Sequence, residues 1–407
     1  MTSVYVETYG CTLNQSESEE LMLRLQGHTA AESIEEANVV VLNTCMVIST
    51  TEEKILKRID TIYPHLGGRM LIITGCMVES FREEFETTYP ASSAMQISDV
   101  ASYIDAHFPP SAPSAAEPRV AARVKIAQGC VGSCSYCVVR LIKGRVESRT
   151  IEAVAADVEQ RLQNGAKQIF LAAQDAGAYG LDQGYRLPDL IAALCEIKCD
   201  FKLRVGMMNV ASILDIAEDL LAAFRHPHVY RFVHVPVQSG SDRILKLMGR
   251  GHTVSDFKQL VSRFRHEFGG LTLSTDFIVG FPTETEGDFQ ATLNLLREVS
   301  PLKVNITRFS RREGTQASFM APIVSRITKE RSRILTAEHH RVACQRNREL
   351  VGKRYAALAV EKGKQGSTIL YNNNYRPVVV RQELVLGVSY AVRIIDATPT
   401  YLLGSLI

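Results

Sequence analysis

The sequence predicts an α/β protein in three parts: an N-terminal parallel α/β sheet domain (1–106), a central partial (β/α)6 TIM-like barrel (121–340) and a small C-terminal all-β domain (345–407). Short β-branched runs alternate with helical patterns up to about residue 310, and this alternation is typical of parallel sheets. After the long basic helical pattern of 325–354, the chain changes to short alternating strands separated by Gly, Asn and Pro, which predicts the all-β part.

Three strands predicted in the N-terminal domain each end in a cysteine. They read SVYVETYGC, ANVVVLNTC and GRMLIITGC, and they end at Cys11, Cys45 and Cys76. Ligands of parallel sheets collect at the carboxyl ends of the strands, so we expect these cysteines to share one edge and one site. The alternative is three independently buried cysteines, because free cysteine is among the most buried residue types.

A linker and six strand–helix units follow. Residues 107–120 are rich in Pro, Ser and Ala, which predicts a linker. Too few units follow it for a full eight-unit barrel, so a partial parallel barrel is expected. The strand candidates are 124–130, 167–175, 201–209, 231–240, 271–282 and 302–310, with helical patterns such as 151–165 and 284–300 between them.

The bulk properties indicate an ordinary globular chain. It has 407 residues, 46% hydrophobic residues and a net charge of +2, so any affinity for nucleic acid must come from local patches. No run of about 18 apolar residues and no secretory signal pattern is present, and we therefore expect a cytoplasmic protein without a membrane partner. Clustered cysteines in such a chain indicate metal ligands rather than disulfides.

The segment GCVGSCSYC places Cys130, Cys134 and Cys137 within eight positions. A closed zinc site needs four ligands, usually in two pairs, and a four-iron cluster normally takes four cysteines. Three thiolates leave one coordination position open. This CxxxCxφC pattern, with Tyr136 before the last cysteine, resembles the radical S-adenosylmethionine (SAM) enzymes; the alternative is a structural zinc loop with a distant fourth ligand.

The resemblance implies a 4Fe-4S cluster whose fourth iron has no protein ligand and chelates SAM, which is then reductively cleaved to a 5′-deoxyadenosyl radical. Segments 171–180, 234–253, 276–289 and 310–317 resemble the methylthiotransferases of this superfamily, which replace C–H with C–SCH3. In that family the N-terminal cysteines hold a second, auxiliary 4Fe-4S cluster, and the terminal β-domain is a TRAM domain that binds RNA. The implied cofactors are therefore two 4Fe-4S clusters and SAM, with no catalytic residue beyond the clusters.

The resemblance also implies residues near SAM or the substrate. A carboxylate such as Asp276, inside an apolar strand, must be paired or bound to a ligand. For Asp175 the alternative role is a helix cap. The cysteines outside both sets, Cys195, Cys199 and Cys344, are expected to be structural. The predicted SAM-binding residues are Tyr136, Gln174, Asp175, Gln238, Ser239 and Asp276.

Two basic regions indicate a polyanionic partner, although a solvated helix face is the alternative for the second. The resemblance is to the archaeal–eukaryotic branch that acts on N6-threonylcarbamoyladenosine beside the tRNA anticodon, which implies the tRNA anticodon stem-loop, a one-electron reductant and a sulfur donor as partners. The alternatives are methylthiolation of isopentenyladenosine in tRNA or of a ribosomal-protein aspartate, and a non-enzymatic iron–sulfur RNA-binding or electron-transfer protein. The predicted RNA-binding residues are Arg140, Lys143, Arg145, Arg149, Lys353 and Arg354.

Overall fold

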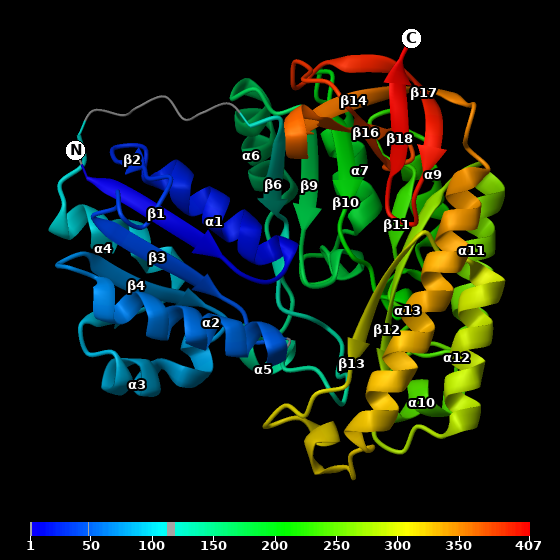
Figure 1. Cartoon of the computed structure of the whole chain (residues 1–407), viewed down its shortest axis with the longest axis horizontal. Coiled ribbons are helices and arrows are strands. Elements are labelled where there is room, and N and C mark those ends of the chain that lie inside the picture. The colour runs from blue at the N-terminus through cyan, green and yellow to red at the C-terminus, as the bar shows by residue number, and fades with distance from the viewer. Residues whose placement is uncertain (1, 48, 112–118) are drawn as a thin grey trace. The chain divides into compact units, whose positions relative to one another are not determined.

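A computed structural model describes residues 2–47, 49–111 and 119–407, and the chain divides into two compact units (Figure 1). Unit 1 comprises residues 1–118 and 138–144, and unit 2 comprises 119–137 and 145–407. Half of the predicted linker (107–120), namely residues 112–118, lies outside the described residues.

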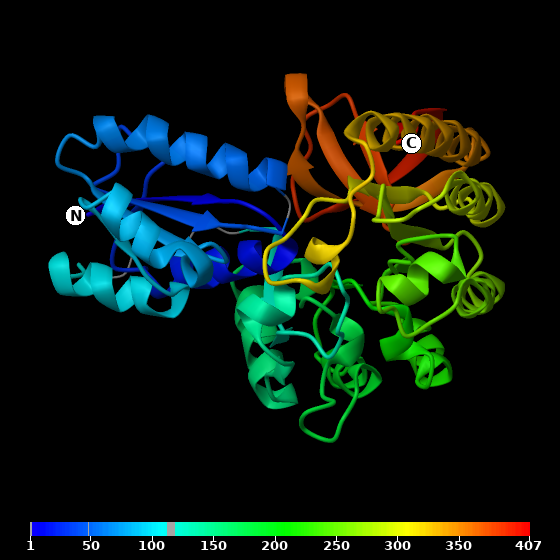
Figure 2. The ribbon, with the colours of Figure 1, turned by 90° about the horizontal axis from the view of Figure 1, so that it is seen from below.

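Unit 1 is built on a five-stranded parallel sheet, as the strand–helix alternation predicts. Helices cover both faces of this sheet (Figure 2). Apolar residues of α2 and α3 pack with one face, and those of α1 and α4 pack with the other. In spatial order the strands are β2 (Thr29–Ala30), β1 (Ser3–Thr8), β3 (Val39–Thr44), β4 (Met70–Gly75) and β5 (Ser92–Ala94). The helices are α1 (Thr12–Arg24), α2 (Ser49–Ile62), α3 (Val78–Thr88) and α4 (Ile97–His107).

The short helix α5 (Val139–Lys143) belongs to unit 1, although the sequence prediction assigned these residues to the central barrel. Ile142 packs against the apolar core of unit 1, and Lys143 forms an ion pair with Glu17 of α1. Both contacts join residues far apart in the chain, so strand–helix alternation could not reveal them.

Unit 2 contains six parallel strands in two three-stranded sheets. Isolated parallel bridges, Leu203 to Val229 and Met207 to His234, join the two sheets. The strand order is β10 (Lys202–Val205), β9 (Gln168–Ala172) and β6 (Ala121–Lys125) in one sheet, and β11 (Phe232–His234), β12 (Thr272–Val279) and β13 (Lys303–Arg308) in the other. The intervening helices include α6 (Ile151–Gln163), α7 (Leu187–Cys195), α9 (Ala217–Phe224), α10 (Asp242–Leu247), α11 (Val254–Glu267) and α12 (Glu286–Val299).

The long helix α13 (Ser325–Arg348) crosses the second sheet and is held there by a buried ion pair. Arg331 donates to the Glu284 carboxylate at 2.7 Å, and both side chains are almost fully buried. The basic helical pattern of 325–354 predicts an exposed charged surface. Arg331 is instead buried, and His339 of the same helix is also buried, with its ring facing the carbonyl of Leu302.

The C-terminal segment forms a closed five-stranded barrel, which confirms the small all-β part. Its β15–β16 turn packs on the amino ends of the unit 2 strands, where Tyr375 contacts Phe170, Tyr230 and Phe232. In barrel order the strands are β14 (Arg354–Lys362), β15 (Thr368–Asn372), β16 (Pro377–Val380), β18 (Leu402–Leu406) and β17 (Ser389–Ala397).

Among the described residues, the helices all lack the combination of length and apolar composition that crossing a bilayer requires.

Candidate active site

The three N-terminal cysteines come together at one edge of the unit 1 sheet, as the sequence predicts. Cys45 and Cys76 directly follow the adjacent strands β3 and β4, and Cys11 follows β1 and begins α1. The Asn14 Oδ1 atom lies 3.7 Å from the Cys11 sulfur and 3.8 Å from the Cys76 sulfur. The alternative of three independent buried cysteines therefore does not describe this arrangement.

Asn14 holds the three cysteine-bearing segments together. Its side-chain nitrogen donates to the backbone carbonyl oxygens of Tyr9 at 3.0 Å and Thr44 at 2.8 Å. These carbonyls belong to the segments that lead to Cys11 and Cys45, and the side chain of Asn14 is buried. Sequence reasoning missed Asn14; the available signal was its position three residues after Cys11, in the first turn of the helix that the cysteine begins.

Gly10 provides the space that the cysteine set requires. It adopts φ +97°, in the left-handed region, and a Cβ atom there would lie 2.6 Å from the Cys45 sulfur. A side chain at residue 10 would occupy the place of that sulfur, so glycine is required at this position for steric reasons.

Lys143 lies close to this cysteine set within unit 1. Its ammonium group pairs with Glu17 at 3.5 Å, and its side chain is only 14% exposed. Burial raises the pKa of the Cys76 thiol to about 12, while the positive charge of Lys143 opposes that rise. The ammonium would therefore stabilise negative charge on the thiolates of an iron–sulfur cluster. The sequence predicts that Lys143 binds RNA, and its position beside the cysteines gives it a second possible role.

The second cysteine set lies on a loop of unit 2 that neighbouring segments support on two sides. Ser135 donates from its backbone nitrogen to the Met248 carbonyl at 2.9 Å and from its hydroxyl to the Leu247 carbonyl at 2.8 Å. The Ser135 carbonyl in turn accepts a 2.7 Å hydrogen bond from the nitrogen of Ala317. The loop is thus fixed by both the end of α10 and the segment before α13.

The cysteine sulfurs of this loop face hydrogen-bond donors. The Gly132 nitrogen lies 3.2 Å from the Cys130 sulfur, and a Cβ atom on Gly132 would lie 3.3 Å from that sulfur and 3.7 Å from the Cys134 sulfur. The Arg250 guanidinium donates to the Cys134 sulfur at 3.5 Å and to the Asn209 side chain at 2.8 Å. Sequence reasoning missed Arg250, whose signal was an arginine between the two glycines of MGRGHT.

Two predicted SAM-binding residues carry buried oxygen atoms that have no hydrogen-bond partner. These are Gln174 Oε1 and Gln238 Oε1. Such a group costs free energy unless a ligand or water satisfies it. Gln238 also adopts φ +75°, a conformation uncommon for a residue with a side chain, and strain of this kind gathers at binding sites.

The other predicted SAM-binding side chains have partners within the protein. Asp175 is buried and accepts from the Gly177 backbone nitrogen at 3.1 Å, which caps the short 3-10 helix Ala176–Ala178, as the capping alternative describes. It also accepts from the Ser212 hydroxyl at 2.6 Å. The Ser239 hydroxyl lies against Thr292. Asp276 is paired with His234 at 2.8 Å and is half-buried.

Tyr136 is the last of the predicted SAM-binding residues, and Gly240 directly follows another of them. Tyr136 packs edge-on against Phe281, and burial raises its pKa. Gly240, which follows Ser239, allows the loop to approach α12 closely: a Cβ atom there would lie 2.5 Å from the Ala291 carbonyl oxygen.

The predicted RNA-binding residues differ in exposure. Lys143 is paired with Glu17, as described above. Arg149 donates to Asp157 at 2.9 Å and to the carbonyl of Lys125 at 2.8 Å. The exposed members are Arg140, Arg145, Lys353 and Arg354.

Both cysteine sets fit an iron–sulfur cluster by the chemistry of their donors. Each unit gathers three thiols, and no disulfide is formed among the described cysteines. Thiolates are the ligands that iron–sulfur clusters require. Each set consists of three cysteines, Cys11, Cys45 and Cys76 in one and Cys130, Cys134 and Cys137 in the other. Each set would therefore supply three thiolates to an iron–sulfur cluster.

Comparison with known families gives two matches, one within each unit. Residues 124–296 match the Radical SAM superfamily. Residues 3–96 match a family described as uncharacterized protein family UPF0004.

Curated relatives align over nearly the whole chain. A probable threonylcarbamoyladenosine tRNA methylthiotransferase of Archaeoglobus fulgidus is 37% identical over 99% of this chain and 98% of its own length. The protein of the same description from Methanothermobacter thermautotrophicus is 38% identical over 98% of this chain and 99% of its own. A tRNA-2-methylthio-N(6)-dimethylallyladenosine synthase of Dictyoglomus thermophilum is 32% identical over 100% and 99%.

Solved structures share the fold at low sequence identity. The radical SAM methyltransferase TsrM from Kitasatospora setae matches with a TM-score of 0.54 at 14% identity, over 78% of this chain and 77% of that one. The cobalamin-dependent radical SAM enzyme OxsB matches with a TM-score of 0.54 at 12% identity, over 84% and 56%. Both are α/β radical SAM folds.

Proposed function

We propose a substrate and a cofactor set from the premise that this chain belongs to the radical SAM superfamily and, within it, to the family of threonylcarbamoyladenosine tRNA methylthiotransferases. It is an enzyme that converts N6-threonylcarbamoyladenosine at position 37 of tRNA, beside the anticodon, to the 2-methylthio derivative. The single observation that carries the two-cluster part of the proposal is the pair of separate cysteine trios, each gathered within its own unit around local donors.

The finer parts of the fold follow from the same premise. The six parallel strands of unit 2 form the partial TIM-like barrel of the superfamily, and the closed β-barrel at the carboxyl end is the TRAM domain. The exposed cations on and near these elements are the RNA contacts. The reductant and the sulfur donor are separate partners, and we place the reaction in the cytoplasm.

Two three-cysteine clusters would supply a reducing centre with an open iron that binds SAM and a second open iron that holds the sulfur to be transferred. The residues of the chain prepare these sites. Asn14 and Gly10 hold the unit 1 thiols together, and Lys143 places positive charge beside them. In unit 2, Arg250 donates to Cys134, and the unpartnered oxygens of Gln174 and Gln238 offer acceptors to a polar ligand such as SAM.

The reaction can be tested with the full chain reconstituted anaerobically with iron and sulfide, then supplied with SAM, a one-electron reductant, a sulfide source and tRNA carrying threonylcarbamoyladenosine. We expect 5′-deoxyadenosine and the methylthio nucleoside, both measured by mass spectrometry. Cys130→Ala should abolish both products. Cys11→Ala should abolish the methylthio nucleoside but retain 5′-deoxyadenosine formation, and Cys344→Ala, outside both sets, should retain both.

The substrate is tested by competition with tRNA carrying isopentenyladenosine, because a relative named for that chemistry is 32% identical to this chain. Methylthiolation of only the isopentenyl nucleoside would move the protein to that branch. Modification of an aspartate in a ribosomal protein, with both tRNAs unchanged, would contradict the tRNA assignment. No 5′-deoxyadenosine from a fully loaded wild-type chain would favour a non-enzymatic iron–sulfur protein.

A further inference from the structure

Three potential metal ligands converge in unit 2, outside both cysteine trios. The Cys195 sulfur and ring nitrogens of His226 and His228 all lie within 4.8 Å of one another. Tetrahedral zinc with bonds of about 2.0 to 2.3 Å places its ligand atoms roughly 3.3 to 3.8 Å apart, so small side-chain rotations would close the set around an ion. The sequence predicts a structural role for Cys195 because it belongs to neither cysteine set. The two histidines lie about thirty residues further along the chain, so spacing does not reveal the group.

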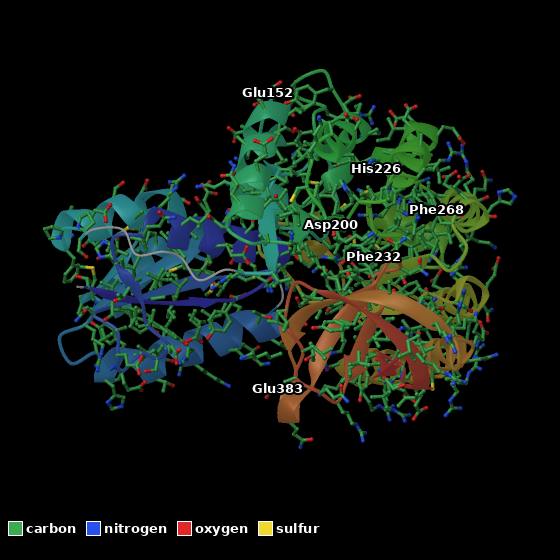
Figure 3. The ribbon with its side chains drawn as sticks, turned by 90° about the horizontal axis from the view of Figure 1, so that it is seen from above. Glu152, Asp200, His226, Phe232, Phe268 and Glu383 are labelled. Atoms are coloured by element: carbon green, nitrogen blue, oxygen red, sulfur yellow. The ribbon has the colours of Figure 1, made fainter. Side chains whose placement is uncertain are left out.

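The backbone fixes these residues at the ends of regular elements. Cys195 is the last residue of α7, and the histidines follow the end of α9. The His228 carbonyl accepts a 2.8 Å hydrogen bond from the nitrogen of Leu203 in β10, so the histidine segment continues the parallel sheet. Figure 3 views this face of unit 2, where His226 and Asp200 are labelled.

The hydrogen bonds of the two histidines leave nitrogen atoms for a metal. His226 uses Nδ1 to accept from the backbone nitrogen of His228 at 3.3 Å, which leaves its Nε2 free to coordinate. His228 Nδ1 is buried and has no hydrogen-bond partner. A buried ring nitrogen without a partner is costly, and a bound cation would satisfy it. Phe201 packs against the His228 ring at 4.5 Å between centroids and fixes its plane.

We propose that Cys195, His226 and His228 bind one divalent transition-metal ion, with Zn²⁺ the best match to one thiolate and two imidazoles. A fourth position is left for water or a nearby carboxylate such as Asp200.

The consequence of this site is structural. Lys202 of β10 links the loop that carries the histidines to the C-terminal β-barrel: its ammonium donates to the carbonyl of Pro227 at 2.7 Å and to the Asn373 side chain at 2.9 Å. The nitrogen of Arg231 donates to the Asn373 carbonyl at 2.9 Å. An ion that joins the end of α7 to this loop would hold the surface on which the β15–β16 turn rests.

The test is the zinc content of the full chain, purified anaerobically with its clusters, given one equivalent of Zn²⁺ and then desalted. We expect about one zinc per chain in the wild type and less than about a tenth of that in Cys195→Ser and His228→Gln. Cys199→Ser is the matched control, because this cysteine lies in the same loop but outside the ligand set, and it should keep its zinc. Zinc loss in the two ligand variants should also lower the unfolding temperature while iron content stays unchanged.

X-ray absorption at the zinc edge identifies the ligands without interference from iron. We expect one sulfur at about 2.3 Å and two nitrogens at about 2.0 to 2.1 Å. A shell of three sulfurs would mean that zinc has entered an iron–sulfur site, and this result overturns the proposal. The proposal also fails if the wild type retains no zinc, or if Cys195→Ser retains as much as the wild type. None of these outcomes depends on methylthiotransferase activity.

Discussion

Gly10 shows how a single backbone position can determine whether a cluster site exists. At φ +97° any side chain is strained, at a cost of about 1–2 kcal/mol, and here a Cβ atom would also lie 2.6 Å from the Cys45 sulfur. We predict that Gly10→Ala removes the unit 1 cluster, so that iron falls from about eight to about four atoms per reconstituted chain, while 5′-deoxyadenosine formation remains. Iron analysis and product quantification measure this.

Gly68 provides the matched control for this prediction. It also adopts a positive φ, +85°, in unit 1, but a Cβ atom there would meet nothing within 4 Å. Gly68→Ala should therefore lower stability slightly and retain full iron content. Equal iron loss in both variants would mean that backbone strain in unit 1, and not the space beside Cys45, controls the cluster.

At the scale of elements, α13 is attached to the loop between β12 and α12 by a buried charge pair. Arg331 donates to both the carboxylate and the carbonyl of Glu284, and the same carboxylate accepts from the nitrogen of Gly280. Removing one member of a buried pair leaves the other charge uncompensated, which costs about 3–5 kcal/mol. We predict that Arg331→Met lowers the free energy of unfolding by this amount, measured by urea titration.

Two further variants distinguish the loss of this ion pair from a general effect of substitution in α13. Arg333→Met, at an exposed position of the same helix, should change stability by less than about 0.5 kcal/mol. Glu284→Gln combined with Arg331→Met should recover part of the loss, because the remaining buried charge is then absent. A double variant no more stable than Arg331→Met would show that the pair does not act through charge.

The contact between β13 and the β15–β16 turn contains Lys303, a lysine whose charged form is destabilised by burial. The Lys303 ammonium lies 5.0 Å from the centre of the Tyr375 ring and 5.7 Å from that of Phe232, and Arg204 stacks on the same two rings. Burial, with a smaller contribution from Arg204, lowers the pKa of Lys303 to about 8. The charged Lys303 therefore lowers the free energy of unfolding at neutral pH by up to about 3 kcal/mol, and the cation–π contacts partly offset this loss.

The pH dependence of this penalty follows from linkage. Below about pH 8 the lysine is charged in both states, and the penalty is complete. Between about pH 8 and 10 the unfolded chain binds more protons, so the wild type gains stability as pH rises. We predict that Lys303→Met raises the urea midpoint at pH 7 and that the gain shrinks toward pH 10. Lys329→Met, at an exposed site on α13, is the control; a gain for Lys303→Met that does not change with pH would contradict the mechanism.

At the scale of the whole molecule, the sequence predicts the features that recur as local patterns along the chain. The strand–helix alternation and the cysteine at the end of three strands are local patterns, and the structure confirms both. Contacts between distant segments leave no such pattern. Arg250 is 116 positions from Cys134, and Lys143 is 126 positions from Glu17. The donors around the two cysteine sets and the place of α5 in unit 1 therefore could not be deduced from spacing.

Exposure also divides the predicted RNA-binding residues in a way that charge counting cannot. Lys143 and Arg149 hold Glu17 and Asp157, whereas Arg140, Lys353 and Arg354 are exposed. With a net charge of only +2, the chain as a whole attracts a polyanion weakly, so each local phosphate contact should be measurable. When a cation that contacts phosphate is replaced by a neutral residue, binding releases one counterion fewer from the RNA. The magnitude of the slope of log K against log salt then falls by about 0.7 to 0.9.

We therefore predict that Arg140→Ala, Lys353→Ala and Arg354→Ala each weaken tRNA binding and each reduce the salt slope by about one unit, measured by fluorescence anisotropy between about 50 and 200 mM salt. Lys54→Ala, at an exposed site on α2 outside the predicted set, should leave the slope unchanged. Lys143→Ala separates two roles of one residue: a reduced slope would indicate a phosphate contact, whereas lost iron at unchanged slope would indicate that its charge serves the neighbouring thiolates. If the three exposed variants bind with the wild-type slope, the RNA lies elsewhere on the protein, and the charge around the cluster loop has a purely local function.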